Sequence, residues 1–570
     1  MKQRVIFLIP VVAAAALALA PPSSAQQPPT IYGASYLAPV VPDEFDGDLR
    51  NLPTTPAWRA GDPIMEVPKR RTTPIGPLPL VAANQMDPLL GVQDESLAKI
   101  PDRAFTTAAL NFAGQAYNGV APPDTNGDVG TTYYIQMINS PSGSGVTIYN
   151  KATGALVSGP TALDSLGGTG NCATGLGDPV VMYDQFAQRW FLSEFSNGGS
   201  RLCIYISKTS DPVSSGWWIY NFAAPSFPDY PKYGVWHDAY YATTNEGGGP
   251  ALYAMDRTAM LSGSAATMQR FPVTRLNGFG FQALTPADAD GATPPSGSTP
   301  AYFVRHRDDE VHNVGSNNAS SDFIEVWELV IDWNTPASSA LTGPTNIAVA
   351  EFDSDLCGLS SFYCFPQPGS GTTLDPLREV VMWRAQYRNF GTHQTLIGNL
   401  VTDITGSDQG GIRWFELRRT SGSWALHQEG TYAPDSIHRW MGSVAMDGDG
   451  NIALGYNVSD VTSVYPGLRY TGRLASDSAG VMSQSESVIV AGSASSSTNR
   501  YGDYSAMTVD PVDDCTFWFT GEYNAASTWS TRIASFKFDS CGASPTPAPT
   551  PNPTPTNVSD AVLWFLLKRD

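Results

Sequence analysis

The chain has 570 residues and a net charge of −20, with 53 acidic residues against 33 basic ones. An apolar content of 42% predicts a folded globular protein. The negative charge disfavours binding to nucleic acid and to anionic membrane surfaces, because phosphate groups would be repelled. With 53 Gly and 45 Pro, the composition favours many strands joined by tight turns over helices.

The first 25 residues have the pattern of an export signal. Lys2 and Arg4 precede an apolar run over 5–20, and the small residues Ser23, Ser24 and Ala25 follow. The apolar run is too short for a comfortable membrane span. We therefore expect residues 1–25 to be a signal peptide, and the protein to be secreted to the periplasm or outside the cell with no stable membrane span after processing.

Prolines mark both flanks of the remaining chain. Twelve of them lie between residues 26 and 90, which excludes a long helix or a central strand there. We expect 26–100 to be a Pro-rich extended lead-in that lies on the main domain; disorder is the alternative. Residues 543–558 have the composition of a stiff Pro/Thr linker, and 559–570 form a short apolar tail.

The region 101–542 contains a recurring unit. Each copy has a Gly-marked or charge-marked entry, a short strand, an Asp/Gly turn and an aromatic-rich strand, and each is followed by a second strand pair. The copies begin near residues 124, 177, 230, 281, 378, 439 and 500. Four-stranded units that stack radially bury both faces of every sheet. We predict an all-β fold, a single β-propeller of seven four-stranded blades. Six or eight blades remain alternatives, as do two β-sandwiches.

The last unit is one strand short. The segment 104–112, which precedes the first unit, could supply the missing strand and close the ring.

Six cysteines follow the export signal, which predicts three disulfides. Neighbours in sequence favour the pairs Cys172–Cys203, Cys357–Cys364 and Cys515–Cys541, although six cysteines allow 15 pairings.

Asp124, Asn126 and Asp128 place three oxygen side chains at alternate positions before Gly130. This pattern resembles the first half of a calcium loop and makes Ca²⁺ the candidate cofactor. The alternative is a turn in which the acids cap backbone amides.

The stretch 126–133 also resembles the Asp-box turn (Ser/Thr-x-Asp-x-Gly-x-Thr-Trp) of sialidase-like propellers, and 210–217 is a looser version. In that superfamily the box is structural. The chain as a whole resembles a group of exported bacterial propellers with PPDTNGDVG-, GDPVV-YD-RW- and WGDYS-like segments, here at 122–130, 177–190 and 501–505. The resemblance implies a propeller and carries over no catalytic residue.

Signatures of serine esterases, zinc proteases and nucleotide-binding loops are absent from the sequence. Polar residues do recur at the repeat entries, where propeller loops converge on the axis. The candidate catalytic residues are Asp178, Asp238, Asp503 and Tyr504. The candidate ligand-binding residues are Lys232, Trp236, His237, Arg384, Arg388, Arg439, Trp440 and Arg500. The alternative for each of them is ion pairing or packing between blades.

These residues predict a protein that binds, and could cleave, extracellular glycan such as polysaccharide. Paired carboxylates would supply the acid and base, and aromatic rings would stack on sugars. Arg384, Arg439, Arg500 and Tyr504 could imitate the arginine clamp and tyrosine of sialidases, although the Phe/Tyr-Arg-Ile-Pro motif is absent. The alternative is a non-enzymatic adhesion or interaction scaffold. The oligomeric state stays open.

Overall fold

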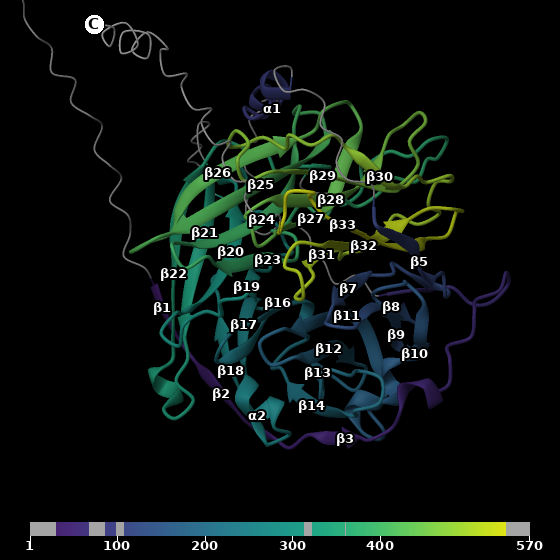
Figure 1. The fold of residues 1–570 in the computed structure, drawn as a ribbon, viewed down its shortest axis with the longest axis vertical. Coiled ribbons are helices and arrows are strands. Elements are labelled where there is room, and N and C mark those ends of the chain that lie inside the picture. Colours follow the sequence, from purple (N-terminus) through teal and green to yellow (C-terminus); the bar gives the residue numbers. More distant parts are fainter. Residues whose placement is uncertain (1–29, 68–85, 98–107, 313–321, 359–360, 543–570) are drawn as a thin grey trace, which may run out of the picture.

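The computed structural model describes residues 30–67, 86–97, 108–312, 322–358 and 361–542 (Figure 1). The predicted signal peptide, linker and apolar tail lie outside these ranges. Strands dominate the described residues, and the α-helices there are short: α1 (Leu90–Leu97), α2 (Arg257–Leu261) and α3 (Asp309–His312). None of the described helices is long and apolar enough to cross a membrane. The described residues are thus nearly all-β, as predicted.

The strands after residue 125 form consecutive antiparallel groups of four. The first group is β7–β10 (Asn126–Val129, Tyr133–Ser140, Gly143–Asn150, Leu156–Ala162). The second is β11–β14 (Gly175–Asp184, Arg189–Ser196, Arg201–Ser207, Trp217–Ala223). The third is β15–β18 (Asp229–Val235, Ala239–Glu246, Gly249–Asp256, Ala266–Pro272), and the fourth is β19–β22 (Thr285–Asp290, Ala301–Arg307, Asp322–Val330, Ala340–Val349).

Three further groups complete the series. The fifth is β23–β26 (Ala385–Asn389, Gln394–Asp403, Gly410–Arg419, Ala425–Tyr432) and the sixth is β27–β30 (His438–Met446, Ile452–Ser459, Gly467–Arg473, Ser487–Val490). The seventh joins β31–β33 (Ala506–Val509, Phe517–Tyr523, Ser530–Phe536) to β5 (Leu110–Ala116). A strand from before the first group thus completes the last one, at 110–116 rather than 104–112.

The groups fan out around the middle of the molecule (Figure 1). The first strand of each group contacts the first strand of the next, and β31 contacts β7. β19 and β23 also pair directly as parallel strands, which merges the fourth and fifth groups into one sheet of nine strands that includes β1. Backbone ladders therefore do not by themselves close a ring, and the blade count stays a prediction.

Polar side chains form hydrogen bonds at the inner edges of several groups, where the first strands lie. In each case an oxygen on one first strand accepts a hydrogen bond from a backbone N–H of the neighbouring first strand, which would otherwise be a buried donor without a ladder partner. The pairs are Asn126 with Val181, Asp128 with Tyr183, Asp288 with Val235, Gln386 with Met446 and Ser443 with Met507, at N···O distances of 2.6–2.9 Å.

The lead-in runs along the outer edges of the groups. β1 (Thr30–Gly33), β2 (Ser35–Val40) and β3 (Asp43–Phe45) pair with β22, β18 and β14 as a fifth strand of three groups. Farther on, β4 (Met65–Glu66) pairs with β6 (Val120–Ala121), close to the start of the first group. The segment thus covers edges that would otherwise be open to pairing with other chains.

Hydrophobic side chains fill the spaces between neighbouring sheets. One cluster joins Phe191 of the second group to Tyr233 and Tyr240 of the third, with ring centroids 5.0 and 5.2 Å apart. Both faces of these sheets are buried, so all eight residues of β16 are buried and its sequence does not alternate strictly between apolar and polar residues.

The three predicted disulfides are confirmed: Cys172–Cys203, Cys357–Cys364 and Cys515–Cys541. Each closes a local loop within or beside one group, which restricts the unfolded chain.

We expect Ser443→Ala to destabilise the protein. The Ser443 hydroxyl accepts from the Met507 N–H at 2.9 Å and donates to the Trp383 carbonyl at 3.2 Å, so its loss leaves two buried groups unsatisfied. The free energy of unfolding should fall by about 1–3 kcal/mol in urea titrations. The control is Ser421→Ala, an exposed position between β25 and β26. Equal stability of the two variants would contradict the role assigned to these side chains.

Candidate functional site

Three carboxylates meet at the end of the molecule where the first strands begin. Asp124 precedes β7, Asp178 lies near the start of β11, and Asp503 precedes β31. The Asp503 N–H donates to Asp124 Oδ1 at 3.1 Å. Asn139 joins the other two, since its amide donates to Asp124 Oδ2 at 2.8 Å and its oxygen accepts from the Asp178 N–H at 2.8 Å. We call Asp124, Asp178 and Asp503 the axial carboxylates.

Arg500 supplies positive charge to this group. Its Nη2 lies 2.9 Å from Asp503 Oδ2, and its Nη1 donates to the carbonyl of Val67 in the lead-in at 2.9 Å. Glu522 approaches from β32, where its Oε2 accepts from the Gly502 N–H at 2.7 Å. Sequence reasoning missed Glu522, because it lies on a second strand rather than at a repeat entry.

Burial and mutual repulsion raise the pKa of two of the axial carboxylates, Asp124 and Asp178. Burial, followed by the charge of Asp503, raises the pKa of Asp124 to about 7. Burial also raises the pKa of Asp178 well above its ordinary value, and the charges of Asp124, Asp229 and Asp503 raise it further. Asp229 was likewise missed by the sequence reasoning. At neutral pH the cluster therefore holds a proton donor next to an arginine-paired carboxylate.

Tyr504 lies beside the same cluster, and Lys232 packs on the Tyr230 ring, with its Nζ 4.5 Å from the ring centroid. The Tyr504 hydroxyl donates to the Pro231 carbonyl at 2.9 Å, and burial raises its pKa well above the ordinary value. Lys232 Nζ donates to the Val381 carbonyl at 3.1 Å, and burial lowers its pKa well below the ordinary value. Neither the phenolate nor the ammonium form is favoured at this depth.

Arg384 and Arg388 pair with acids toward the other end of the first strands. Arg384 contacts Asp288 and Asp290 at 2.6 and 2.8 Å, and Arg388 contacts Asp514 at 2.5 Å. Because β19 and β23 are neighbours, the Arg384 pairs connect adjacent groups, whereas the Arg388 pair connects the fifth group to the turn between β31 and β32 of the seventh. They match the alternative of ion pairing between blades.

Trp236, His237 and Asp238 follow the far end of β15. The seven residues of β15 separate them from Asp229 by about 23 Å of extended strand. Both Trp236 Nε1 and His237 Nε2 lie 3.1 Å from the Thr299 carbonyl, and Asp238 Oδ1 accepts from the Tyr241 hydroxyl at 3.0 Å. The structure does not bring these residues to the axial carboxylates.

Arg439 and Trp440 are buried on β27. Arg439 pairs with Asp435 at 2.8 Å and with Glu486 at 2.9 Å. The fully buried Trp440 ring packs against Phe365 and Tyr501, at centroid distances of 5.5 and 5.6 Å. Its faces are covered by these rings rather than open to a sugar.

The side-chain oxygens of the predicted calcium loop accept hydrogen bonds from other parts of the protein. As described above, Asn126 and Asp128 accept backbone N–H bonds from β11, and Asp124 accepts from Asp503 and Asn139. The stretch that resembles an Asp box, 126–133, forms β7 and the turn into β8. Calcium at this loop stays a prediction.

No family model and no curated protein matches the chain. Similar solved structures include the WD40 domain of SCAP from fission yeast (10% identity, TM-score 0.29, covering 75% of this chain and 90% of that chain). An exo-beta-1,3-galactanase from Phanerochaete chrysosporium has 9% identity and a TM-score of 0.27, with 75% and 100% covered. An endo-arabinase from Bacteroides thetaiotaomicron has 14% identity and a TM-score of 0.25, with 53% and 95% covered. At TM-scores below 0.5, these similarities carry no argument about activity.

We expect the stability of the wild type to fall as the pH rises from about 4 to 7. The folded pKa of Asp124, about 7, exceeds the ordinary value of 3.8, so in this window the folded chain holds a proton that the unfolded chain has released. Asp178→Asn removes a second such carboxyl and its repulsion of Asp124, so the fall should be smaller. The melting temperature measured between pH 4 and 8 checks this. The exposed control Asp539→Asn should follow the wild type, and a parallel Asp178→Asn curve would contradict the coupling.

Proposed function

We propose that this protein is an exported propeller of seven blades that binds extracellular glycan at its axis and hydrolyses it by acid–base chemistry. The observation that carries the proposal is the convergence of Asp124, Asp178 and Asp503, from three separate groups, around Arg500.

Contacts across the middle of the molecule support a ring of seven blades. Asp503 of the seventh group hydrogen-bonds Asp124 before the first. Arg384 of the fifth group pairs with Asp288 of the fourth, and its charge also acts on Asp128 of the first. Strands so far apart in sequence meet in this way when they surround one axis.

The axial carboxylates have the two properties that glycoside hydrolysis requires. Asp178, whose pKa is raised, would hold a proton to give to the leaving glycosidic oxygen. Asp503, paired with Arg500, would act as the carboxylate that activates water or attacks the sugar. Asp178 and Asp503 are each only 7% exposed, so a ligand would need an opening at this end, beside Val67, to reach them.

The disulfides support the proposal that the protein is secreted. Three disulfides and no free cysteine among the described residues suit an oxidising compartment, and they agree with the export signal expected at 1–25.

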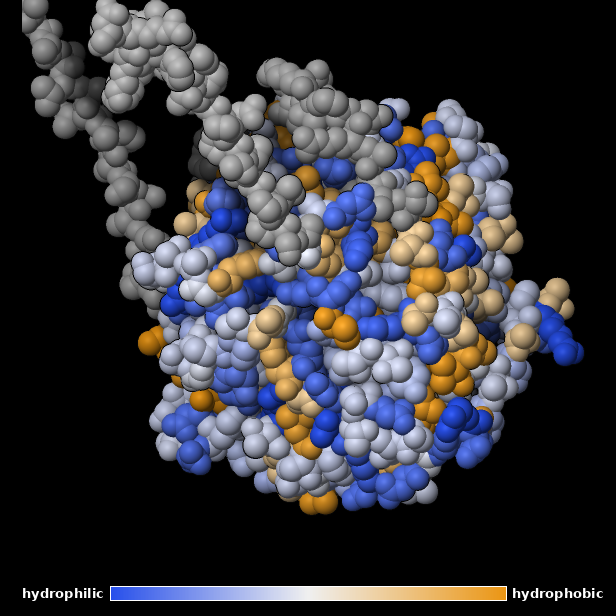
Figure 2. All heavy atoms as spheres, viewed as in Figure 1, coloured by the Kyte–Doolittle hydropathy of each residue, from blue (hydrophilic) through white to orange (hydrophobic). Residues whose placement is uncertain are grey.

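A second candidate is a non-enzymatic adhesion or interaction scaffold. Seven of the twelve large hydrophobic side chains that are exposed in the described part of the chain lie in the lead-in, at Ile31, Tyr36, Val41, Ile64, Met65, Met86 and Val92. Figure 2 also shows hydrophobic residues gathered along one side of the viewed face. Exposed apolar residues of this kind favour a protein partner.

The test is the release of reducing ends from a panel of neutral and acidic polysaccharides. Asp178→Asn should lower kcat at least about 100-fold without loss of glycan binding, because a general acid contributes about 10²–10⁴-fold. Asp238→Asn, the same change at a carboxyl on the far side of β15, should retain wild-type activity. A folded wild type that neither binds nor cleaves any glycan would contradict the proposal and favour the scaffold.

A further inference from the structure

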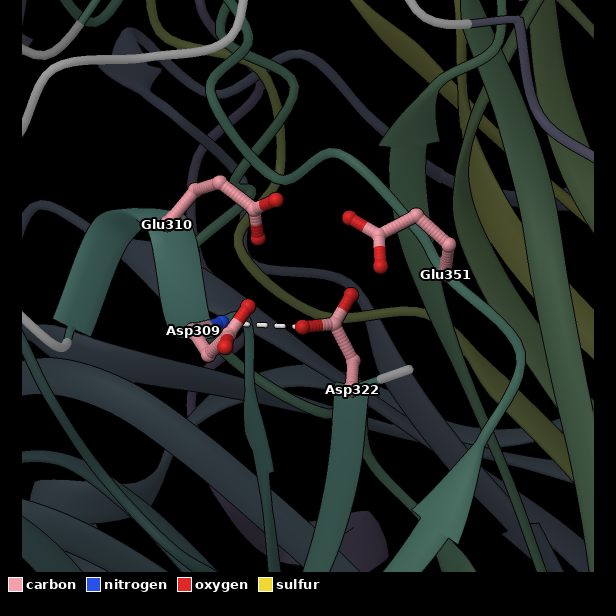
Figure 3. A group of neighbouring side chains, drawn as sticks. All are labelled: Asp309, Glu310, Asp322 and Glu351. Atoms are coloured by element: carbon pink, nitrogen blue, oxygen red, sulfur yellow. Dashed lines mark hydrogen bonds between the residues drawn. The ribbon is translucent and has the colours of Figure 1, made fainter. Parts of the chain in front are cut away.

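Four acidic side chains converge at one end of the fourth group (Figure 3). Asp309 and Glu310 belong to α3, Asp322 is the first residue of β21, and Glu351 follows the end of β22. One carboxylate oxygen from each lies within 4.8 Å of the other three. Figure 3 shows the carboxylates turned toward one another rather than outward. We call them the acidic group.

This acidic group is poorly placed for water to screen its charge. Glu310 is 8% exposed and Asp322 is fully buried, while Glu351 is half-buried. The charges that act on Glu310 and Asp322 are those of other carboxylates, including Asp308. Buried like charges are costly unless they are protonated or neutralised by a cation.

Arg413, whose charge acts on the acidic group, has other partners. The charge of Arg413 acts on Glu351. However, its guanidinium pairs with Asp87 at 2.9 Å and with Glu429 at 3.3 Å. Arg413 therefore neutralises Asp87 and Glu429, which lie outside the acidic group. A divalent cation could still balance the negative charge within the group.

Glu310 provides an independent sign of a ligand. Its Oε2 is buried and has no hydrogen-bond partner among the described residues, and its carboxylate is directed into the group in Figure 3. Glu351 Oε2 is likewise buried without a hydrogen-bond partner there. Asp322, in contrast, is fixed by the backbone, since its Oδ1 accepts from the Asp309 N–H at 2.8 Å and its Oδ2 from the Phe352 N–H at 2.9 Å. One rigid carboxylate and two with unused oxygen atoms form a partly prepared ligand set.

We propose that Asp309, Glu310, Asp322 and Glu351 bind a calcium ion. Calcium takes oxygen ligands at about 2.3–2.6 Å, which places oxygens on opposite sides of the ion about 4.6–5.2 Å apart. The spacing of the four oxygens, all within 4.8 Å, suits that geometry. An all-carboxylate set favours a hard cation over zinc or copper. The bound ion would join α3 to the ends of β21 and β22.

Calcium binding at this place would release protons. Without a metal, burial and the neighbouring acids raise the pKa of Glu310 to about 10 and that of Asp322 to about 9. Both carboxyls would have to ionise before coordinating the ion. The heat of binding at pH 7 should therefore change with the ionisation enthalpy of the buffer.

The experiment titrates CaCl₂ into EDTA-treated full-length secreted protein by calorimetry, in two buffers. We expect one ion per chain, proton release, and affinity lowered at least tenfold in Glu310→Gln and in Glu351→Gln. Glu328→Gln, the same change at a half-buried position of β21, and Asp128→Asn, in the sequence-predicted loop, should bind as the wild type does.

Melting temperatures give a second readout, because the difference between the wild type and Glu310→Gln should depend on calcium. In EDTA, Glu310→Gln should melt close to the wild-type temperature, because burial and the neighbouring acids raise the pKa of Glu310 to about 10 and Gln replaces a protonated side chain of similar size. In CaCl₂ the wild type should gain stability and the variant should not. A folded wild type that binds no calcium would overturn the proposal. Wild-type affinity in both Glu310→Gln and Glu351→Gln would also overturn it. So would a loss of binding confined to Asp128→Asn.

Discussion

The structure depends on satisfying the inner edges of its sheets. The first strand of each group lies in the middle of the molecule, where water is excluded and a free backbone N–H would cost about 1–3 kcal/mol. Side-chain oxygens of the neighbouring first strand accept several of these hydrogen bonds, as Asp128 does for Tyr183 and Gln386 does for Met446. Direct parallel pairing serves the same purpose between β19 and β23. Polar residues in otherwise hydrophobic strands are thus the connectors between sheets.

The same constraint places charge near the middle. An acid that accepts a backbone N–H there can still have a raised pKa, as Asp124 does. Toward one end of the first strands the arginines balance the acids in pairs, as at Arg384 with Asp288. At the other end Arg500 faces several carboxylates. The two places differ in how the acids are held: Arg384 contacts both Asp288 and Asp290, whereas Arg500 contacts Asp503 and the pKa of Asp178 stays well above its ordinary value.

Sequence predicted what is encoded locally. Disulfide partners are close in the chain, and the repeat entries locate the first strands and so Asp178, Asp503 and Arg500. Sequence reasoning could not tell the start of a first strand from its end. It therefore grouped Asp238, which follows the end of β15, with Asp178, which lies near the start of β11. Nor could it find Glu522 or the acidic group, because α3, β21 and β22 contribute acids that are up to 42 residues apart and share no spacing pattern. Whether an arginine meets one acid or several depends on packing between groups.

The central claim is that side chains lock the inner strands together. Amide hydrogen exchange, resolved to single residues by mass spectrometry, tests it most directly at Val181, Tyr183, Val235, Met446 and Met507. The account predicts that these amides exchange as slowly as those of the antiparallel ladders in the same groups. It also predicts that Asp128→Ala accelerates exchange at Tyr183 more than at Met446. Rapid exchange of all five amides in the wild type would show open inner edges and contradict the account.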